Sequence, residues 1–437
     1  MEYNWINFVA KMTEDCIVFN DSFNEIIRSN SLPKKITTLT FGIEFNQKIE
    51  PNSLPEKLNN LTFGWKFNKK IKPNTLPEQL VSLEFGYEFN KIIESNNLPK
   101  NLSILEFSVC FNQKINSNNL PENLTTLIFG NNFNQKIELN SLPENLTIIV
   151  FGENFDQKIE PNSLPEKLNN LTFGDKFNQK IEPNSLPENL VNLTFGQDFN
   201  QKIEPNSLPE NLLNLIFGYN FNQKIELFSL SKNLTNLTFG YNFNQKIVTN
   251  SLPENLVNLT FGYTFNQKIE PYSLPENLTN LTFGYYFNQK IEPFSLPENL
   301  TTLTFEQNFV QKIEPENIPS NLTNIIFHWS SYPIGSNQVN MINNIPRSYN
   351  VKIFMDNNKN SNVVKSKWPI HMCNYDNLDI VRTKSTFYKC DDNIISDLSP
   401  DIYVVIDEYT DPIYGAITIV INNETYEPYS YAKSAFK

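Results

Sequence analysis

Residues 54–75 read LPEKLNNLTFGWKFNKKIKPNT, and residues 76–97 repeat the pattern as LPEQLVSLEFGYEFNKIIESNN. The first Phe of this pattern lies at positions 41, 63, 85 and 107, and it recurs at the same interval up to Phe327, without an insertion. A fixed period of this length is typical of solenoids, in which each repeat forms one coil. We therefore predict about fourteen coils over residues 32–331. A degenerate half-repeat, at residues 17–27, precedes them.

The residue types within a repeat favour a β-coil. Leu61, Thr62 and Phe63 alternate between apolar and polar, which is the period of a strand. Pro55 and Pro73 fix φ and lack a donor N–H, so they suit corners. Gly64 follows the strand, and we expect a tight bend or a positive φ there. No stretch free of Pro and Gly carries the apolar spacing of a helix.

One repeat cannot fold alone. Its six large apolar side chains contribute roughly 1.5–3 kcal/mol each on burial, whereas ordering each of its residues costs about 1–2 kcal/mol in backbone entropy. Stacked coils share their interior and their strand hydrogen bonds with both neighbours. The predicted fold class is therefore a β-rich repeat solenoid, similar to leucine-rich repeats, in which parallel strands stack with one coil per repeat. At about 4.8 Å per strand it would be roughly 65 Å long.

Stacking also predicts ladders of identical side chains. An Asn recurs from Asn46 to Asn288, with Asp156 as its one replacement. A buried Asn at a corner can bridge backbone groups of successive coils. Lys136 and Glu138, with their equivalents in the following coils, would form rows in which diagonal Lys–Glu contacts offset the like charges. The alternative is a solvated face with little net energy.

The run Phe67-Asn68, Ile71, Pro73 and Leu76-Pro77 resembles the FNIP repeat, a family of social amoebae and giant DNA viruses. The resemblance implies a fold related to leucine-rich repeats and no known catalytic residues. Some viral relatives carry an F-box that docks to a ubiquitin ligase, so the resemblance also implies a substrate-recognition adaptor as an alternative function. The segment before the first full repeat, residues 1–31, is too short for a complete F-box.

Both ends are predicted to cap the solenoid. Residues 1–31, with Trp5, Ile6 and Phe8, would cover the first coil. Residues 332–437 depart from the repeat, and we expect a degenerate last coil followed by a small β-rich or α+β module. Alternating β-rich segments at 402–406 and 416–421 support this interpretation. Uncapped ends would expose apolar faces and unpaired strand edges.

Composition argues against several classes of protein. The net charge of −12 opposes binding to nucleic acid or anionic membranes. The longest apolar stretch, at 402–421, contains Asp407, Glu408 and Asp411, so no membrane span is expected. The N-terminus lacks the pattern of a signal peptide, and the four cysteines are scattered. These features predict an intracellular, cytoplasmic protein.

No catalytic arrangement is predicted. The sequence lacks a Ser/His/Asp set, a Gly-rich phosphate loop and a zinc-like cysteine pairing. His371, Cys373, Cys390 and Asp391 match no standard metal spacing. We therefore predict a protein without enzymatic activity, cofactor or metal. Its expected partners are other proteins, which it binds as an interaction scaffold through the solenoid surface.

Aromatic side chains at variable positions are the candidate partner-binding residues. One set follows the Phe-Gly pair in successive coils, and a second set replaces an Asn of the repeat. The first set is Tyr219, Tyr241, Tyr263 and Tyr285, with Tyr286 beside the last, and the second is Phe228, Tyr272 and Phe294. Exposed aromatic patches are common anchors for partners. The alternative is that the tyrosines stack on one another and only stabilise the coils.

Overall fold

The computed structural model describes residues 7–329, 350–355, 378–381, 402–403 and 420–421. It is a parallel β-solenoid with one coil per 22 residues, so the predicted fold class is confirmed. The chain divides into two compact units, Met1–Leu256 and Val257–Lys437, which are described separately below as unit 1 and unit 2. No helix among the described residues is long and apolar enough to cross a membrane.

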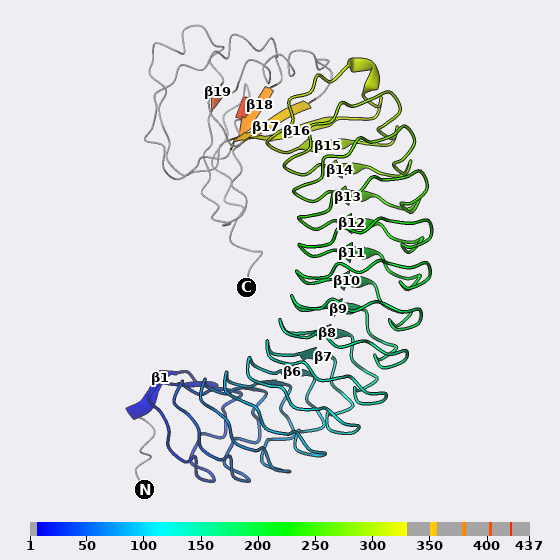
Figure 1. The fold of residues 1–437 in the computed structure, drawn as a ribbon. Coiled ribbons are helices and arrows are strands. Elements are labelled where there is room, and N and C mark those ends of the chain that lie inside the picture. Colours follow the sequence, from blue (N-terminus) through cyan, green and yellow to red (C-terminus); the bar gives the residue numbers. More distant parts are fainter. Residues whose placement is uncertain (1–6, 330–349, 356–377, 382–401, 404–419, 422–437) are drawn as a thin grey trace. The chain divides into compact units, whose positions relative to one another are not determined.

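Unit 1 consists of strands joined by turns (Figure 1). Its strands are β1 (Val9–Met12), β2 (Cys16–Phe19), β3 (Thr38–Thr40), β4 (Asn60–Thr62), β5 (Ser82–Glu84), β6 (Ile104–Glu106), β7 (Thr126–Ile128), β8 (Ile148–Val150), β9 (Asn170–Thr172), β10 (Asn192–Thr194), β11 (Asn214–Ile216) and β12 (Asn236–Thr238). From β2 to β12, each strand pairs in parallel with the next, as Leu61 does with Leu83. β1 is antiparallel to β2.

The N-terminal segment continues the core of unit 1. Ile17, Phe19, Phe23 and Ile27 of the half-repeat are all buried. The ring of Phe8 lies 5.7 Å from that of Phe23, centroid to centroid, so it packs at the end of the aromatic core as expected. Trp5 and Ile6 lie outside the described residues.

Three turns close each coil of the array. In the coil around β4, the amide of Leu58 donates to Pro55, that of Phe67 to Gly64 and that of Thr75 to Lys72, at 3.1, 3.1 and 3.3 Å. The two prolines of the repeat thus lie at corners, as predicted. Asn74 occupies the third position of its turn with φ of 60°, which matches a type II turn with Pro at its second position.

Of the two alternatives expected for the glycine after the strand, the tight bend is observed, because Gly64 begins a turn that the amide of Phe67 closes. The positive φ is not observed at any of the described glycines. A Cβ on Gly64 would instead lie 1.7 Å from the carbonyl oxygen of Gly42 in the preceding coil. Glycine is therefore needed because successive backbones approach closely at this corner. The left-handed residue is the Asn three residues before Pro-Glu, as at Asn52.

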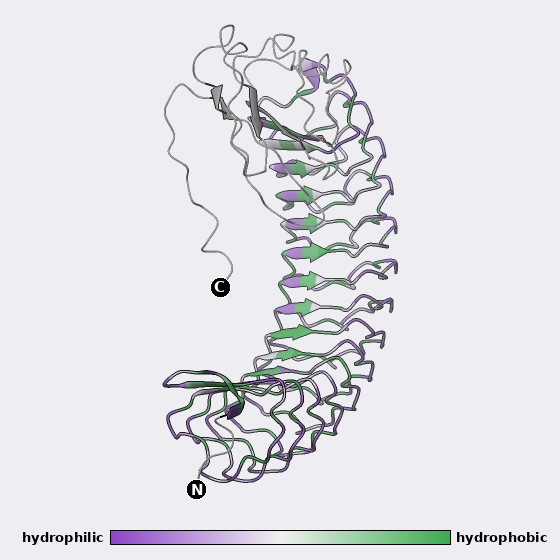
Figure 2. Cartoon of the chain, turned by 90° about the vertical axis from the view of Figure 1, so that its left-hand side faces the viewer, coloured by the Kyte–Doolittle hydropathy of each residue, from purple (hydrophilic) through white to green (hydrophobic). Residues whose placement is uncertain are grey.

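Two columns of phenylalanine fill the interior. Phe63 and Phe67 are 3% and 0% exposed, and their ring centroids lie 3.7 Å apart. Each ring also stacks on its equivalent in the next coil, with 5.8 Å between Phe63 and Phe85. Leu and Ile residues of the repeat complete the core. Figure 2 shows the resulting pattern, in which many strands begin with a hydrophilic residue and continue with a hydrophobic one.

The asparagine ladder is confirmed. The Oδ1 atom of Asn112 accepts the backbone N–H of Asn134 at 3.0 Å and the side-chain amide of Gln135, also at 3.0 Å. Asp156 continues the ladder, because its carboxylate accepts the same two bonds from Asn178 and the following Gln. We expected the ladder residues to be buried, but they are partly exposed.

The lysine and glutamate rows are also observed. The Nζ atom of Lys136 lies 3.9 Å from Glu138 in its own coil and 3.7 Å from Glu160 in the next. Both predicted types of contact are therefore present. All these side chains are substantially exposed, so each pair contributes about 0–1 kcal/mol.

Unit 2 continues the same repeat with longer strands at its end. Its elements are β13 (Asn258–Thr260), β14 (Asn280–Thr282), β15 (Thr302–Phe305), the 3-10 helix η2 (Pro315–Asn317), β16 (Asn324–Trp329), β17 (Asn350–Met355), β18 (Leu378–Val381), β19 (Ile402–Tyr403) and β20 (Val420–Ile421). Parallel pairing runs from β13 to β18. The short β19 and β20 pair antiparallel.

The glycine corner is lost in the last coils of unit 2. Glu306 and His328 replace the glycine, and the Nδ1 atom of His328 lies 2.7 Å from a Glu306 carboxylate oxygen. β15 and β16 extend to four and six residues, whereas β13 and β14 have three. In these two coils, the replacement of the glycine therefore coincides with a longer strand.

Candidate functional site

Each strand carries one outward side chain between its buried Leu and the buried Phe, and we call this series the outward row. In unit 1 it contains Thr40, Thr62, Glu84, Glu106, Ile128, Val150, Thr172, Thr194, Ile216 and Thr238. Strands in a sheet lie about 4.8 Å apart, so neighbours in the row are within side-chain contact. Five of these ten residues are threonine, and the other five are Ile216 and the four successive residues from Glu84 to Val150.

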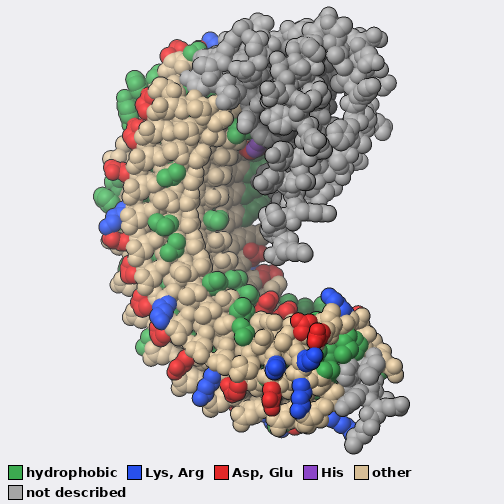
Figure 3. Space-filling model, turned by 180° about the vertical axis from the view of Figure 1, so that it is seen from behind, with side chains coloured by type: hydrophobic (Ala, Val, Ile, Leu, Met, Phe, Trp, Pro, Cys, Tyr) green, Lys and Arg blue, Asp and Glu red, His purple; other side chains and the backbone are tan. Residues whose placement is uncertain are grey.

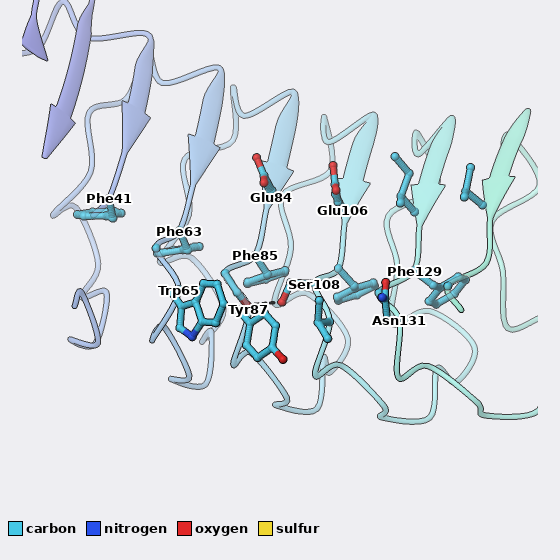
Figure 4. Close-up of a pocket in the computed structure, with 18 of the residues that line it drawn as sticks. Phe41, Phe63, Trp65, Glu84, Phe85, Tyr87, Glu106, Ser108, Phe129 and Asn131 are labelled. Carbon is cyan, nitrogen blue, oxygen red and sulfur yellow. Dashed lines mark hydrogen bonds between the residues drawn. The ribbon is translucent and has the colours of Figure 1, made fainter. Parts of the chain in front are cut away.

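A groove of about 860 Å³ in unit 1 lies along this part of the outward row (Figure 4). Its lining extends from Val18 to Asp175 and includes backbone of the glycine corners. Among the residues that the structure describes, five carboxylate side chains line it and no Lys, Arg or His does. They are Asp21, Glu84, Glu106, Glu153 and Asp175. The groove is therefore acidic.

Glu84 and Glu106 are paired directly across the parallel strands β5 and β6. Glu84 accepts a hydrogen bond from the Thr62 hydroxyl at 3.2 Å. Burial, and secondarily the negative charge of Glu84, raise the pKa of the Glu106 carboxyl. Among the described residues, neither glutamate forms an ion pair with a Lys or Arg. The two carboxylates repel each other and lack a cation.

Two aromatic rings line the same groove as these carboxylates, at the turns that follow the strands. Trp65 and Tyr87 follow the Phe-Gly pair of adjacent coils, a series that we call the turn row. Their rings stack with centroids 4.1 Å apart and an interplanar angle of 9°. They are 50% and 37% exposed, and both line the groove (Figure 4). Aromatic faces and carboxylates thus share one open surface.

The groove includes the coil in which the glycine corner changes. Ser108 replaces the glycine and its hydroxyl donates to the backbone oxygen of Gly86. Val109, next to it, takes the turn-row position and lines the groove. Carboxylates in this array recur mainly as surface ladders, and for that reason our sequence interpretation did not single out Glu84 and Glu106. The signal that could have found them is the replacement of the outward-row threonine.

The predicted tyrosine set lies in the turn row, on the surface of both units. In unit 1, Tyr219 stacks on Tyr241 with ring centroids 4.3 Å apart. In unit 2, Tyr263 stacks on Tyr285 at 4.3 Å, and Tyr286 contacts both of those rings edge-on. Tyr219 and Tyr286 are the more exposed members, at 44% and 48%. Tyrosines of successive coils thus stack on one another. The alternative in which they only stabilise the coils requires this stacking.

The second predicted set occupies the left-handed position of the type II turn. Phe228, Tyr272 and Phe294 have φ of 63°, 59° and 62° where other coils have Asn. They are 79%, 61% and 64% exposed. Tyr272 and Phe294 stack with centroids 5.5 Å apart. This set lies at a different corner of the coil from the tyrosine set.

The residues that the structure describes hold no group of three or more His, Cys, Asp or Glu that could bind a metal ion. His371, Cys373, Cys390 and Asp391 lie outside those residues. Figure 3 shows a face made largely of backbone and of side chains that are neither hydrophobic nor charged, with hydrophobic and charged side chains scattered across it.

Comparison with known proteins agrees with this architecture. Models of the FNIP repeat match residues 16–43, 45–88, 89–132, 133–176, 177–220, 221–264, 265–308 and 287–330. A solved giant-virus structure, described as CroV588, a novel circular LRR protein, has 46% sequence identity and a TM-score of 0.72. The match covers 80% of this chain and 50% of that one, so the chain spans half the length of that relative.

Two further comparisons add nothing on function. The structure of the pneumococcal vaccine antigen PcpA matches over 79% of each chain, but with 14% identity and a TM-score of 0.19 it carries no argument. No protein with a curated function matches the sequence. None of the matches indicates a catalytic family.

Proposed function

Because the chain belongs to the FNIP repeat family, we propose that it is a non-enzymatic scaffold that binds other proteins through side chains outside its solenoid frame. Its partners are cytoplasmic proteins. Each coil devotes the same buried positions to the core and leaves the outward and turn rows free to vary. Solenoids in which a constant core supports variable surface positions offer an extended binding surface.

The observation that carries this proposal is the aromatic stacks in the turn row, of which Trp65, Tyr87 and Tyr219 are exposed and the other members half-buried. Trp65–Tyr87, Tyr219–Tyr241 and Tyr263–Tyr285 occupy a position that other coils fill with Asn, Glu, Asp or Gln. The frame therefore does not require an aromatic ring there. Exposed Tyr and Trp are enriched among the residues that dominate binding energy at interfaces.

The first prediction tests the tyrosine set. The double variant Tyr241→Asn, Tyr263→Asn introduces the residue found at the same position in Asn131. If the tyrosines bind a partner, affinity purification with crosslinking recovers a stoichiometric protein with the wild-type chain and at least tenfold less with the variant. The matched control changes a polar member of the same row that lies outside the groove, Gln197→Asn, and retains the partner. A folded double variant that keeps the partner at full yield would assign these tyrosines to coil stabilisation alone.

The ubiquitin-ligase alternative has less support. The described N-terminal residues, 7–31, form β1, β2 and extended segments, without an α-helix. An F-box is helical, so nothing in this segment favours an adaptor. Residues 333–437 are described only in the strands β17 to β20.

A further inference from the structure

We propose that the groove along Glu84 and Glu106 binds an extended, arginine-containing peptide segment of a partner protein. This inference rests on the proposed scaffold function and names the chemistry of the partner at one site. The groove belongs entirely to unit 1, and it differs from the surfaces that carry the predicted tyrosine and left-handed sets.

Charge complementarity selects a cationic occupant. The lining contains five carboxylates and no basic side chain. Glu153 is 3.8 Å from Lys176 and accepts a hydrogen bond from Asn131, so it is partly compensated. Glu84 and Glu106 form no such ion pair, and the raised pKa of Glu106 reflects the cost of holding its charge there. A cation between the two carboxylates relieves their repulsion and favours the ionised form of Glu106.

The aromatic rings of Trp65 and Tyr87 in the groove favour arginine over lysine. A planar guanidinium stacks on aromatic faces and also donates two parallel hydrogen bonds to a carboxylate. Trp65 and Tyr87 present a stacked pair of exposed rings in the same groove as the two glutamates. An arginine therefore suits both features of the groove, because its guanidinium can bind a carboxylate or stack on a ring, whereas a lysine ammonium does not stack in this way.

Apolar side chains extend the site in one direction. Ile128 and Val150 follow Glu106 in the outward row and also line the groove. Their midpoint lies two coils beyond the midpoint of the glutamates, which is about 10 Å at the usual strand spacing. Three residues of polyproline II chain span about 9 Å and return to the same side. A segment Arg-Pro-Pro-Leu thus places its arginine at the glutamates and its leucine at the aliphatic pair.

The second prediction uses a synthetic probe and the purified full chain. The probe is a fluorescein-labelled Gly-Ser-Arg-Pro-Pro-Leu-Gly-Ser peptide, and its binding is measured by fluorescence anisotropy at pH 7.4 and low salt. We expect saturable binding that weakens at least tenfold in the Glu84→Gln, Glu106→Gln variant, and also when citrulline replaces the arginine. Trp65→Asn with Tyr87→Asn should weaken it to a similar extent.

The matched control is Glu138→Gln, Glu160→Gln, which removes two carboxylates outside the groove that have lysine partners. Unchanged affinity in this control supports the site. Equal losses in both double variants would show nonspecific charge attraction and overturn the proposal, as would absence of saturable binding to the folded wild-type chain. Failure here leaves the capture of a partner through Tyr241 and Tyr263 unaffected, so it can be separated from failure of the scaffold function.

Discussion

At the scale of single residues, the left-handed corner shows where the frame tolerates strain. Asn fills this corner in most coils, with φ near 60° at Asn52 and Asn74, and its short polar side chain adopts that conformation at little cost. Phe228 keeps the same φ at 63° although it is 79% exposed. A bulky residue in this conformation is uncommon and strained. Little burial offsets that strain at Phe228.

The third prediction follows from this strain. Phe228→Asn should raise the free energy of unfolding by about 1 kcal/mol, since a left-handed conformation costs most L-residues roughly 1–2 kcal/mol and Asn less. Urea denaturation monitored by circular dichroism measures it. The reciprocal variant Asn206→Phe, one coil earlier, should lose a similar amount. Destabilisation by Phe228→Asn would mean that the ring stabilises the coil by packing.

Sequence reasoning at this scale succeeded for side chains that the core buries and failed for the glycine. Phe63 and Leu61 were predicted inward because they alternate with Thr62, and they are buried. The need for Gly64 depends on its distance from Gly42 in the preceding coil. That distance is set by the way the coils stack, so it cannot be predicted from composition or local propensity.

At the scale of elements, the asparagine ladder replaces strand pairing on one side of the coil. The strands have only three residues in most coils, and the segment after the glycine corner is not a strand. There the backbone N–H of each ladder residue donates to the side-chain oxygen of the previous one, as Asp156 does to Asn134 at 2.9 Å. Two residues earlier, backbone amides bond directly to the preceding coil, as Lys66 does to Ile43 at 2.9 Å, so side chains supply the inter-coil hydrogen bonds only at the ladder positions.

The fourth prediction separates the acceptor oxygen from the rest of the Asn side chain. Asn134→Ala leaves the Asp156 amide and the Gln157 side chain without their shared acceptor. It should cost about 1–3 kcal/mol, the usual penalty for an unsatisfied polar group. Asn134→Asp keeps the acceptor, as Asp156 does naturally, and should cost clearly less in chemical denaturation. Equal losses in the two variants would contradict this account of the ladder.

The outward row shows why the candidate groove was harder to predict than the fold. The constant period of the repeat determines which strand positions coincide, so Glu84 and Glu106 could have been placed side by side from sequence. Two other features depend on how the turns fold. Neither glutamate has a basic neighbour among the described lining residues, and Trp65 lines the same groove. Those features come from three-dimensional packing, and repeat spacing does not determine them.

At the scale of the whole molecule, each coil contacts its immediate neighbours in the array, so stability accumulates locally along unit 1. Phe173 lies in the middle of that unit, is 2% exposed and stacks on Phe151 and Phe195 in the adjacent coils. Removal of its ring should therefore destabilise those two adjacent coils most. Tyr263, in the turn row, occupies a position where other coils have Asn or Glu.

The fifth prediction tests this locality. Phe173→Ala should cost about 3–5 kcal/mol, the usual range for truncation of a buried aromatic residue. Hydrogen exchange followed by mass spectrometry should show the largest loss of protection in the coils next to residue 173. Tyr263→Ala should cost far less. Comparable losses for the two variants would show that the inward and outward faces are wrongly assigned, and uniform loss of protection throughout unit 1 would contradict local accumulation.

The antiparallel pairing of β1 with β2 has a consequence for assembly. An in-register parallel ladder is a template on which another molecule could add its own coil, as in the growth of a fibre. At the N-terminal edge that template is already occupied, because β1 runs in the opposite direction and its register shifts between Val9 and Lys11. A shifted register of this kind twists an edge strand and disfavours further pairing. We therefore expect this first hairpin to disfavour the end-to-end addition of a second molecule.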